Sequence, residues 1–397
     1  MQQIYRFQPL QTVFYGNGSI RKLGELARKY GTKAMIISDS IMEGLGYVNE
    51  CKEILDRVNI RSSLYLGVNS EPTDHYVKES LAQLIEEKCD LVISIGGGSC
   101  IDTAKAISIL ATNPGYIGEF IGSARIAEQT PLPHIAIPTT AGTGSEATDV
   151  TVISAMKTDV KMMIKQPAFL PVAAIVDPLL TMSAPKSVTA ATGLDALTHA
   201  IEAYISTKAQ PLTDMFAIAA MENIIPAIKT VYKNGDDHDA RGKMALGSML
   251  AGIAFSNSSV CLVHGMSRPI GALFHVPHGM SNAMLLPVVL EYSMEHCIDR
   301  LAVIGKMFAD EDARGVVRDF ANLAVEKIKE LTAYLNIPNP KEWGIEDSVY
   351  QQALPKMARD ALASGSPQNN PRVPTTEEII ELYKLCYSYN FTKKVNN

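Results

Sequence analysis

The stretch DLVISIGGGSCIDTAKAISIL, residues 90–110, joins an apolar run, three consecutive glycines and a sequence of helix formers. Glycine lacks a Cβ atom, so the backbone of Gly96, Gly97 and Gly98 can approach a ligand closely. The helix that follows offers unpaired N–H groups and the positive end of its dipole, which together bind anions such as phosphate. The run matches neither GxGxxG nor the P-loop pattern. It predicts a phosphate-binding turn, the alternative being a tight turn without a ligand.

Two polar residues at the start of this helix extend the prediction. We expect Ser99 to cap the helix and to donate a further hydrogen bond. We expect Asp102 in the first turn, where its charge complements the dipole and its carboxylate can bind a hydroxyl group or order water. Together with the glycines they form the predicted phosphate site.

Around this stretch, β-rich runs alternate with helical patterns through the first half of the chain. The helical patterns include residues 48–58 and 75–88. Near-continuous apolar strands separated by helices of about ten or more residues indicate a parallel, doubly wound sheet. The predicted strands are residues 32–40, 61–69, 90–98, 134–140, 150–155 and 172–178.

The character of the sequence changes near residues 182–188, after which helix formers dominate and convincing strands disappear. A chain of 397 residues also exceeds what one ordinary core accommodates, so two domains are expected. We predict an α/β domain over residues 1–184 and an all-helical domain over residues 185–397. The last helix can be capped by Thr375 or Thr376.

The composition argues against several classes of protein. A net charge of −6 without a run of Lys or Arg argues against nucleic-acid binding and against a membrane-binding patch. Apolar runs such as residues 91–95 and 172–176 are five residues long, far short of a bilayer span. The polar start of the chain lacks a secretory signal, and the six cysteines are scattered without a CxxC pair, as in reduced proteins. These features predict a cytoplasmic protein of enzyme size.

Two further segments of the first half are compatible with a dinucleotide. Asp39 ends the strand AMIIS, where an acid can accept hydrogen bonds from a ribose 2′-hydroxyl and repel a 2′-phosphate. The alternative for Asp39 is an ordinary turn or cap residue. The loop PTTAGTGSEAT, residues 138–148, follows a strand and is dense in small hydroxyl residues. Such a loop can bind pyrophosphate and the nicotinamide face, although most loops of this composition are only loops.

The second half carries residues suited to a metal. Asp195 and His199 are spaced i, i+4 on one face of a predicted helix, which permits either a shared cation or a simple Asp–His hydrogen bond. The stretch VHGMSRPIGALFHVPHG, residues 263–279, adds His264 and His278. One carboxylate with up to three imidazoles suits Fe(II) or Zn(II), and not Ca(II) or Mg(II).

The chain resembles the iron-containing, group III alcohol dehydrogenase family through four motifs: GGGSCIDTAKA, PTTAGTGSEAT, DALTHAIEAYIS and HGMSRPIGALFHVPHGMSNAMLLP. The motifs occur in the family's order, and the resemblance spreads over roughly residues 5–395. It implies the fold shared with dehydroquinate synthase, an N-terminal Rossmann-like α/β domain for NAD followed by an all-α, metal-binding catalytic domain. It also implies an oxidoreductase acting on CH–OH groups, with reversible hydride transfer between NAD(H) and a small short-chain alcohol/aldehyde pair.

Carried over position by position, the resemblance implies a metal centre and a nucleotide site. The metal ligands would be Asp195, His199, His264 and His278, with Fe(II) favoured and Zn(II) as the alternative. An acidic residue at Asp39 favours NAD over NADP. The implied nucleotide contacts are Asp39, Gly96, Gly97, Gly98, Ser99, Asp102, Thr139, Thr140, Thr143, Thr148 and Lys161.

Two positions depart from the family's pattern. Several members carry a histidine four residues after the third ligand, where this chain has Arg268, and Asn or Asp three residues before the last ligand, where it has His275. An arginine stays protonated at neutral pH and cannot act as a general base. Arg268 either forms a structural ion pair or binds an anionic substrate such as sulfoacetaldehyde bidentately. His275 is either a proton-transfer residue or an outer contact.

Other functions compatible with these residues are a polyol dehydrogenase of the glycerol or 1,3-propanediol type and, more remotely, a dehydroquinate synthase-like lyase. The lyase would need a cluster of Lys and Arg in the helical domain, where few basic residues accompany Arg268. A non-catalytic nucleotide- or metal-binding protein is disfavoured by the complete ligand set. The resemblance also implies a homodimer or larger homo-oligomer, with the N-terminal segment crossing between protomers.

Overall fold

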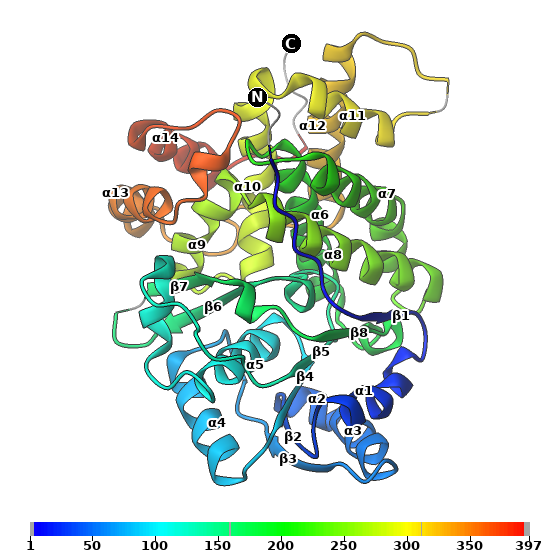
Figure 1. Ribbon diagram of the computed structural model, residues 1–397. Helices are drawn as coiled ribbons and strands as arrows, with labels where there is room; N and C mark the ends of the chain where they lie inside the picture. The colour runs from blue at the N-terminus through cyan, green and yellow to red at the C-terminus, as the bar shows by residue number, and fades with distance from the viewer. Residues whose placement is uncertain (1–3, 159, 311, 393–397) are drawn as a thin grey trace. The chain divides into compact units, whose positions relative to one another are not determined.

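The computed structural model of the chain describes residues 4–158, 160–310 and 312–392. The chain separates into two compact units, one formed by Arg6–Ala184 and one that combines the described N-terminal residues up to Tyr5 with the chain from Pro185 onwards. The first unit combines strands with helices, and the second is built from helices (Figure 1). The predicted fold class, α/β followed by all-α, is confirmed.

A parallel sheet forms the centre of the first unit, with the strand order β1-β8-β5-β4-β2-β3. Every residue of the central strand β4 is buried, because helices cover both faces of the sheet. The strands are β1 (Val13–Tyr15), β2 (Lys33–Ile37), β3 (Arg61–Tyr65), β4 (Leu91–Gly96), β5 (His134–Pro138) and β8 (Ala173–Val176).

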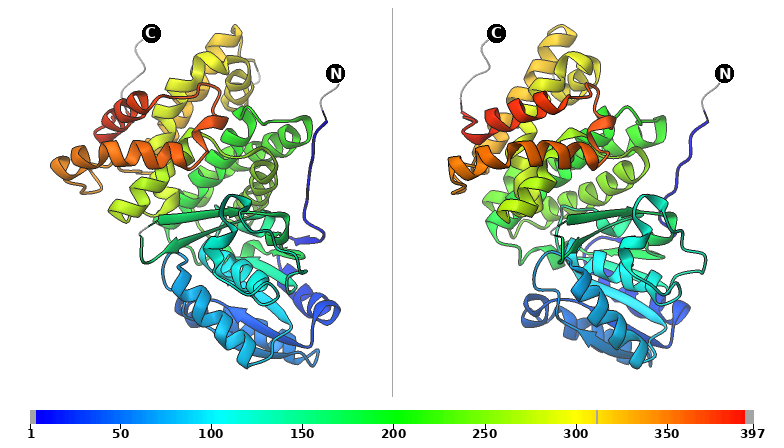
Figure 2. Two further views of the ribbon diagram at one scale, coloured as in Figure 1. Left: turned by 60° about the vertical axis from the view of Figure 1, so that its left-hand side comes forward. Right: turned by 90° about the vertical axis from the view of Figure 1, so that its left-hand side faces the viewer.

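Successive side chains of these strands alternate between two cores, as the pleat requires. Ile36 and Ile93 lie in one core with residues of α1 and α3, whereas Ile37 and Val92 lie in the other with residues of α4 and α5. Figure 2 shows the two pairs of helices on opposite sides of the sheet. Each fully buried Ile or Val contributes about 1.5–3 kcal/mol. The helices of this unit are α1 (Leu23–Tyr30), α2 (Ser40–Gly44), α3 (Tyr47–Asp56), α4 (Asp74–Glu86) and α5 (Gly98–Leu110).

Residues 150–155 form a strand, as predicted, but this strand does not join the parallel sheet. Strand β6 (Val150–Ala155) pairs antiparallel with β7 (Val160–Lys165), which the sequence did not predict. Alternate residues of β6 are buried, the pattern of a strand with one covered face. Local sequence identified β6 as extended, but its partner depended on tertiary structure.

The second unit is a bundle of helices, and its described residues contain no β-strand. Helix α6 is buried on nearly all sides, because other helices of the bundle surround it. Thr375 caps α14 through a hydrogen bond from the N–H of Glu378, which decides between the two predicted caps. The helices are α6 (Lys186–Ile205), α7 (Pro211–Lys233), α8 (His238–Ser258), α9 (Leu262–Phe274), α10 (His278–Ser293), α11 (Ile298–Phe308), α12 (Val317–Tyr334), α13 (Asp347–Ala363) and α14 (Thr376–Tyr387).

In the described part of the chain, no single helix is long and apolar enough to cross a membrane. Helices α8 and α9 meet that criterion only as a pair, with a bend of 104° between them.

The six cysteines are buried and free of disulfide bonds, as predicted from their scattered positions. Burial raises the pKa of Cys100 and of Cys261 well above the usual value for a thiol. Neither side chain is therefore a thiolate at neutral pH, and both fill space in the interior.

His134 yields a prediction about acid stability. Burial, assisted by the charge of Lys105, lowers the pKa of His134 to about 3. An unfolded imidazole protonates near pH 6.5, so between about pH 6.5 and 3 the unfolded state binds a proton that the folded state does not. The free energy of unfolding should therefore fall through this interval, by up to about 1.4 kcal/mol per pH unit.

His134→Gln should make this decline shallower, because the amide does not titrate and can still contact the Ser94 hydroxyl, now 2.8 Å from His134 Nε2. Denaturant unfolding of metal-free wild-type and variant protein at pH 7 and pH 5 measures the difference. An equally acid-sensitive variant would contradict the prediction.

Candidate active site: metal centre and nucleotide loops

One face of α6 carries three polar residues that are almost inaccessible to solvent. Asp195, His199 and Glu202 follow one another at intervals of four and three residues, so they project from the same side of the helix. Their exposed fractions are 1%, 4% and 1%. Polar groups this deeply buried need compensating partners.

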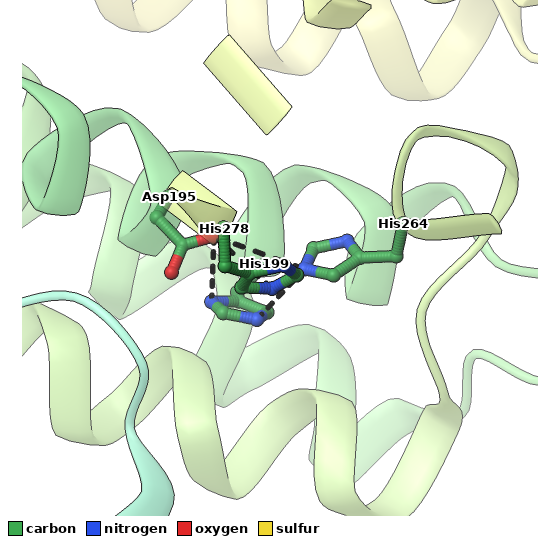
Figure 3. Close-up of side chains that lie close together, drawn as sticks. All are labelled: Asp195, His199, His264 and His278. Atoms are coloured by element: carbon green, nitrogen blue, oxygen red, sulfur yellow. Dashed lines mark hydrogen bonds and ion pairs between the residues drawn. The ribbon is translucent and has the colours of Figure 1, made fainter. Parts of the chain in front are cut away.

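The structure brings together the four predicted metal ligands. His264 comes from α9, and His278 is the first residue of α10. One ligand atom from each of Asp195, His199, His264 and His278 lies within 4.8 Å of the others. Asp195 Oδ1 is 3.8 Å from His264 Nε2 and 3.9 Å from His278 Nε2. Figure 3 shows these side chains pointing toward one another from three helices.

Close contact between α6 and α10 depends on the glycine that follows His278. A Cβ atom on Gly279 would lie 2.7 Å from the carbonyl oxygen of Ala191 and 3.2 Å from Cβ of Asp195. Only a residue without a side chain lets the start of α10 approach α6 this closely. The PHG sequence therefore places His278 beside Asp195.

The protonation of His264 follows from its contact with Glu202. His264 Nδ1 lies 2.6 Å from Glu202 Oε2. Burial raises the pKa of Glu202 to about 7, and hydrogen bonds from the N–H groups of Cys261 and Val263 oppose this shift. In its ionised form the carboxylate only accepts hydrogen bonds, so Nδ1 donates and Nε2 keeps its lone pair. Burial lowers the pKa of His264 well below the usual value, and the neighbouring His199 and Arg268 add to the effect. The ring is neutral, and Nε2 faces His199 Nε2 at 2.9 Å.

Asn282, one turn after His278, shows how many acceptors converge at this point. Its Nδ2 atom lies 2.7 Å from Asp195 Oδ1, 3.0 Å from His264 Nε2 and 3.2 Å from His278 Nε2. An amide nitrogen has only two hydrogens for these three neighbouring atoms, while Asn282 Oδ1 and His199 Nδ1 are buried without a hydrogen-bond partner. A divalent cation satisfies such a set of lone pairs, and one carboxylate with three imidazoles suits Fe(II) or Zn(II). The residues therefore fit the predicted metal.

In the first unit, the glycine stretch forms the turn between β4 and α5, but the helix begins earlier than predicted. Gly97 is the N-cap, and α5 starts at Gly98, so Ser99 lies inside the helix. The prediction that Ser99 caps α5 is wrong, because the backbone enters the helix one residue before it. Gly96 has φ +153°, and a Cβ there would lie 2.6 Å from Sγ of Cys100, so glycine is required.

Asp102 also lies further into α5 than predicted. It occupies the second turn, and its Oδ2 accepts a hydrogen bond of 2.8 Å from the N–H of Val152 in β6. Burial raises the pKa of Asp102 to about 6, although Lys105 opposes this shift. The expectation that Asp102 complements the dipole in the first turn is wrong, and its carboxylate instead ties α5 to β6.

The two segments predicted to bind the nucleotide lie against each other. The N–H of Thr139 donates to the carbonyl of Gly96 at 3.0 Å. A Cβ on Gly98 would lie only 2.8 Å from Cγ2 of Thr143. The glycine turn and the loop of residues 138–148 are therefore packed together, with glycine at the point of closest contact.

Three other predicted nucleotide contacts have protein partners. The hydroxyl of Thr148 is buried and accepts a hydrogen bond of 2.8 Å from Lys105 Nζ. Lys161 Nζ pairs with Glu71 Oε2 at 2.5 Å. Asp39 caps α2, where its Oδ1 accepts hydrogen bonds from two backbone N–H groups. The cap that the sequence left open for Asp39 is thus present, and its contact with a ribose stays a prediction.

Arg268 lies on α9, one turn beyond His264, and its Nη1 donates to the hydroxyl of Ser366 at 3.0 Å. Burial lowers the pKa of Arg268 to about 10, with Glu202 opposing the shift. The guanidinium is still charged at neutral pH and cannot accept a proton there. His275 is exposed and ends α9 in a left-handed conformation, with φ 54°.

Comparison with known proteins places this site in a family. Residues 10–178 match the model of the family described as iron-containing alcohol dehydrogenase, and residues 189–387 match that of the C-terminal part of the same family. The chain belongs to the iron-containing alcohol dehydrogenase family. The predicted enzyme class, an NAD-dependent alcohol dehydrogenase with iron, is confirmed.

Individual relatives cover almost the whole enzyme. A 1,3-propanediol dehydrogenase of Citrobacter freundii is 36% identical over 379 residues, which cover 94% of this chain and 96% of the relative. An NAD-dependent methanol dehydrogenase of Bacillus methanolicus is 34% identical over 370 residues, 93% of this chain and 96% of the relative. The crystal structure of a 1,3-propanediol oxidoreductase has a TM-score of 0.93 at 33% identity and covers 97% of this chain and 100% of its own.

Three residues with evident roles at these sites escaped the sequence analysis. Glu202 and Asn282 each contact a predicted metal ligand, and Lys105 holds Thr148. The spacing offered a signal for two of them. Glu202 lies three residues after His199 on the same helix face, and Asn282 lies four residues after the last ligand. For Lys105 no local signal existed, because its partners come from a distant loop.

Gly98→Ala and Gly97→Ala form a matched pair for the nucleotide turn. The first adds a methyl group 2.8 Å from Thr143 and should destabilise the protein by about 1–2 kcal/mol through overpacking. The second adds a methyl group 3.7 Å from Thr140, an ordinary contact, and should change stability by less than about 0.5 kcal/mol.

Thermal unfolding without nucleotide measures the change in stability of both variants. Fluorescence titration with NADH measures their affinity for the nucleotide. A loss of NADH affinity in Gly97→Ala, whose protein packing is intact, would report a close approach of the nucleotide to this backbone. Equal destabilisation by the two substitutions would contradict the close packing of Gly98 against Thr143.

Proposed function

We propose that this chain catalyses the reversible oxidation of short-chain primary alcohols to aldehydes, with NAD(H) bound by the first unit and the metal held by Asp195, His199, His264 and His278. The convergence of these four ligand atoms on three helices carries the proposal. An iron ion in this position supplies Lewis acidity toward the alcohol oxygen.

The chain's own residues prepare the centre for that chemistry. Asp195 contributes one negative charge, and burial keeps His264 neutral, so both present electron pairs. The Glu202 carboxylate holds the ring proton of His264 at Nδ1, which leaves the electron pair at Nε2. The glycine turn at residues 96–98 offers backbone N–H groups and a helix N-terminus to the pyrophosphate of the dinucleotide.

The names of the relatives support a small alcohol as substrate. One relative is named a 1,3-propanediol dehydrogenase and another a methanol dehydrogenase, whereas a third, from Geobacillus thermodenitrificans, is named a long-chain-alcohol dehydrogenase. Within this proposal a diol is the main alternative, and a long-chain alcohol as the better substrate would contradict it. The proposal also includes a cytoplasmic enzyme, in keeping with its free, buried thiols, and a homodimer or larger homo-oligomer.

Metal removal tests the reaction class. Dialysis against a chelator should abolish NADH oxidation with propanal, followed at 340 nm, and anaerobic Fe(II) or Zn(II) should restore it. Asp195→Ala and His278→Ala should lose both bound metal and activity, because each removes one of four ligands. His75→Ala is the control, since His75 is an exposed histidine paired with Glu79 in the other unit. Full activity in chelator-treated, metal-free protein would refute the proposal.

Arg268 bears on whether the substrate carries a second polar group, such as a sulfonate or a hydroxyl, beside its aldehyde. Its charged guanidinium lies one turn from a metal ligand, where family members often carry a histidine. A planar guanidinium binds carboxylate and sulfonate groups bidentately and can donate to a hydroxyl group. We therefore include anionic short-chain aldehydes, such as sulfoacetaldehyde, among the proposed substrates.

Arg268→Ala distinguishes these substrates. It should raise KM for sulfoacetaldehyde by about 10–100-fold, the value of a charged hydrogen bond, and change KM for propanal little. Arg268→Lys keeps the charge but loses the bidentate geometry, so its KM for sulfoacetaldehyde should lie between those of the wild type and Arg268→Ala. Steady-state kinetics with both aldehydes gives the ratio. Equal losses on both substrates would assign Arg268 to structure instead of recognition.

A further inference from the structure

Glu202 is a buried acid whose carboxylate has three donors directed at it. Its Oε2 accepts from the N–H of Cys261 at 2.9 Å and from His264 Nδ1 at 2.6 Å, and its Oε1 accepts from the N–H of Val263 at 2.6 Å. Two of these donors are backbone groups at the start of α9, and the third is a metal ligand. The carboxylate is therefore shared between a helix terminus and an imidazole.

The two backbone contacts, from the N–H groups of Cys261 and Val263, fix the start of α9. Cys261, the N-cap residue of α9, makes no side-chain cap of its own. The N–H groups in the first turn of a helix lack partners within the helix and attract negative charge. Glu202 satisfies two of these positions from α6, so the beginning of α9 is anchored to α6 by a carboxylate and not by a local cap.

The contact with His264 Nδ1 fixes the orientation of the His264 ring on α9. The hydrogen bond to Glu202 determines which nitrogen of His264 bears the proton and how the ring is rotated. Asp195 and His199 lie on the same face of α6 as Glu202. One rigid helix therefore supplies two ligands and also the group that orients the third.

We propose that Glu202 is a positioning residue for the metal centre. Glu202 holds His264 with Nε2 unprotonated and directed at Asp195 and His199. The inference rests on the proposed function, because it takes these residues as ligands of the metal. It assigns to Glu202 a contribution to metal affinity, although Glu202 is not one of the four proposed ligands.

Glu202→Gln tests the proposal, because it keeps the shape of the side chain and removes one acceptor. With three donors facing it, the amide must direct its NH2 group at one of them. Either the His264 proton moves to Nε2, which removes the ligand's electron pair, or an N–H group at the start of α9 loses its partner. Both outcomes disturb the position of His264.

The measurement is the dissociation constant of Zn(II), determined by competition with a chromophoric chelator on the full-length chain. We expect Glu202→Gln to raise this constant by about 10–100-fold, as for other partners of metal-bound histidines. The metal-free variant should also have a lower Tm, because an N–H group at the start of α9 can lose its partner. The decisive readout is therefore the Zn(II) dissociation constant, together with a smaller rise in Tm on adding Zn(II).

Asp214→Asn is the matched control. It removes a carboxylate that forms two hydrogen bonds with Arg300 in the same helical unit, away from the four ligands. This variant should lower the metal-free Tm and leave the Zn(II) dissociation constant within about twofold of the wild type. A merely structural role for Glu202 would produce the same result in Glu202→Gln.

The outcomes separate the inference from the proposed function. A wild-type Zn(II) affinity in folded Glu202→Gln overturns the inference and leaves the proposed function intact. If wild-type protein binds no Zn(II), or if His278→Ala binds it as tightly as wild type, the proposed function fails first. Should Glu202→Gln not fold, Glu202→Asp decides, because its shorter carboxylate cannot reach His264 and α9 together. An unchanged affinity there overturns the inference, and a raised dissociation constant supports it.

Discussion

Two buried carboxylates on one face of α6 are the constraint on which the second unit depends. Asp195 and Glu202 are each 1% exposed, and a buried charge without partners costs several kcal/mol. Glu202 is compensated by two N–H groups of α9 and by His264, and Asp195 by the amide of Asn282. The need to satisfy these charges draws α9 and α10 against α6 and thereby assembles the ligand set.

The first unit is governed by a steric constraint instead. At its glycine turn, a Cβ on Gly98 would collide with Thr143 of a neighbouring loop, and a Cβ on Gly96 would collide with Cys100 of α5. Lys105 then ties α5 to that loop through the carbonyl and hydroxyl of Thr148. Burial lowers the pKa of Lys105 to about 8, and the nearby Asp102 and Asp149 oppose this shift. The loop is therefore held in place by α5, the same helix whose N-terminus we propose to bind the nucleotide.

Arg268 places a positive charge close to the proposed metal ligand His264. The charge lies one turn beyond His264 on α9, where Arg268 is held by a hydrogen bond to Ser366. Because that charge persists at neutral pH, Arg268 cannot accept a proton there, and under the proposed function it adds an electrostatic element to substrate selection. The distinctive chemistry of the enzyme is therefore expected in the substrate contacts and not at the metal.

The sequence by itself determined the alternation of strands and helices, the fold class and the four candidate ligands, because each depends on local periodicity or on a contiguous motif. It placed Ser99 and Asp102 too early in α5, since the start of a helix is set by backbone geometry that Gly97 and Gly98 leave open. Only the tertiary structure paired β6 with β7, turned Asp102 toward Val152 and brought Glu202 to His264. These contacts join residues 50 or more positions apart in two of the three cases, and no local pattern encodes such a partner.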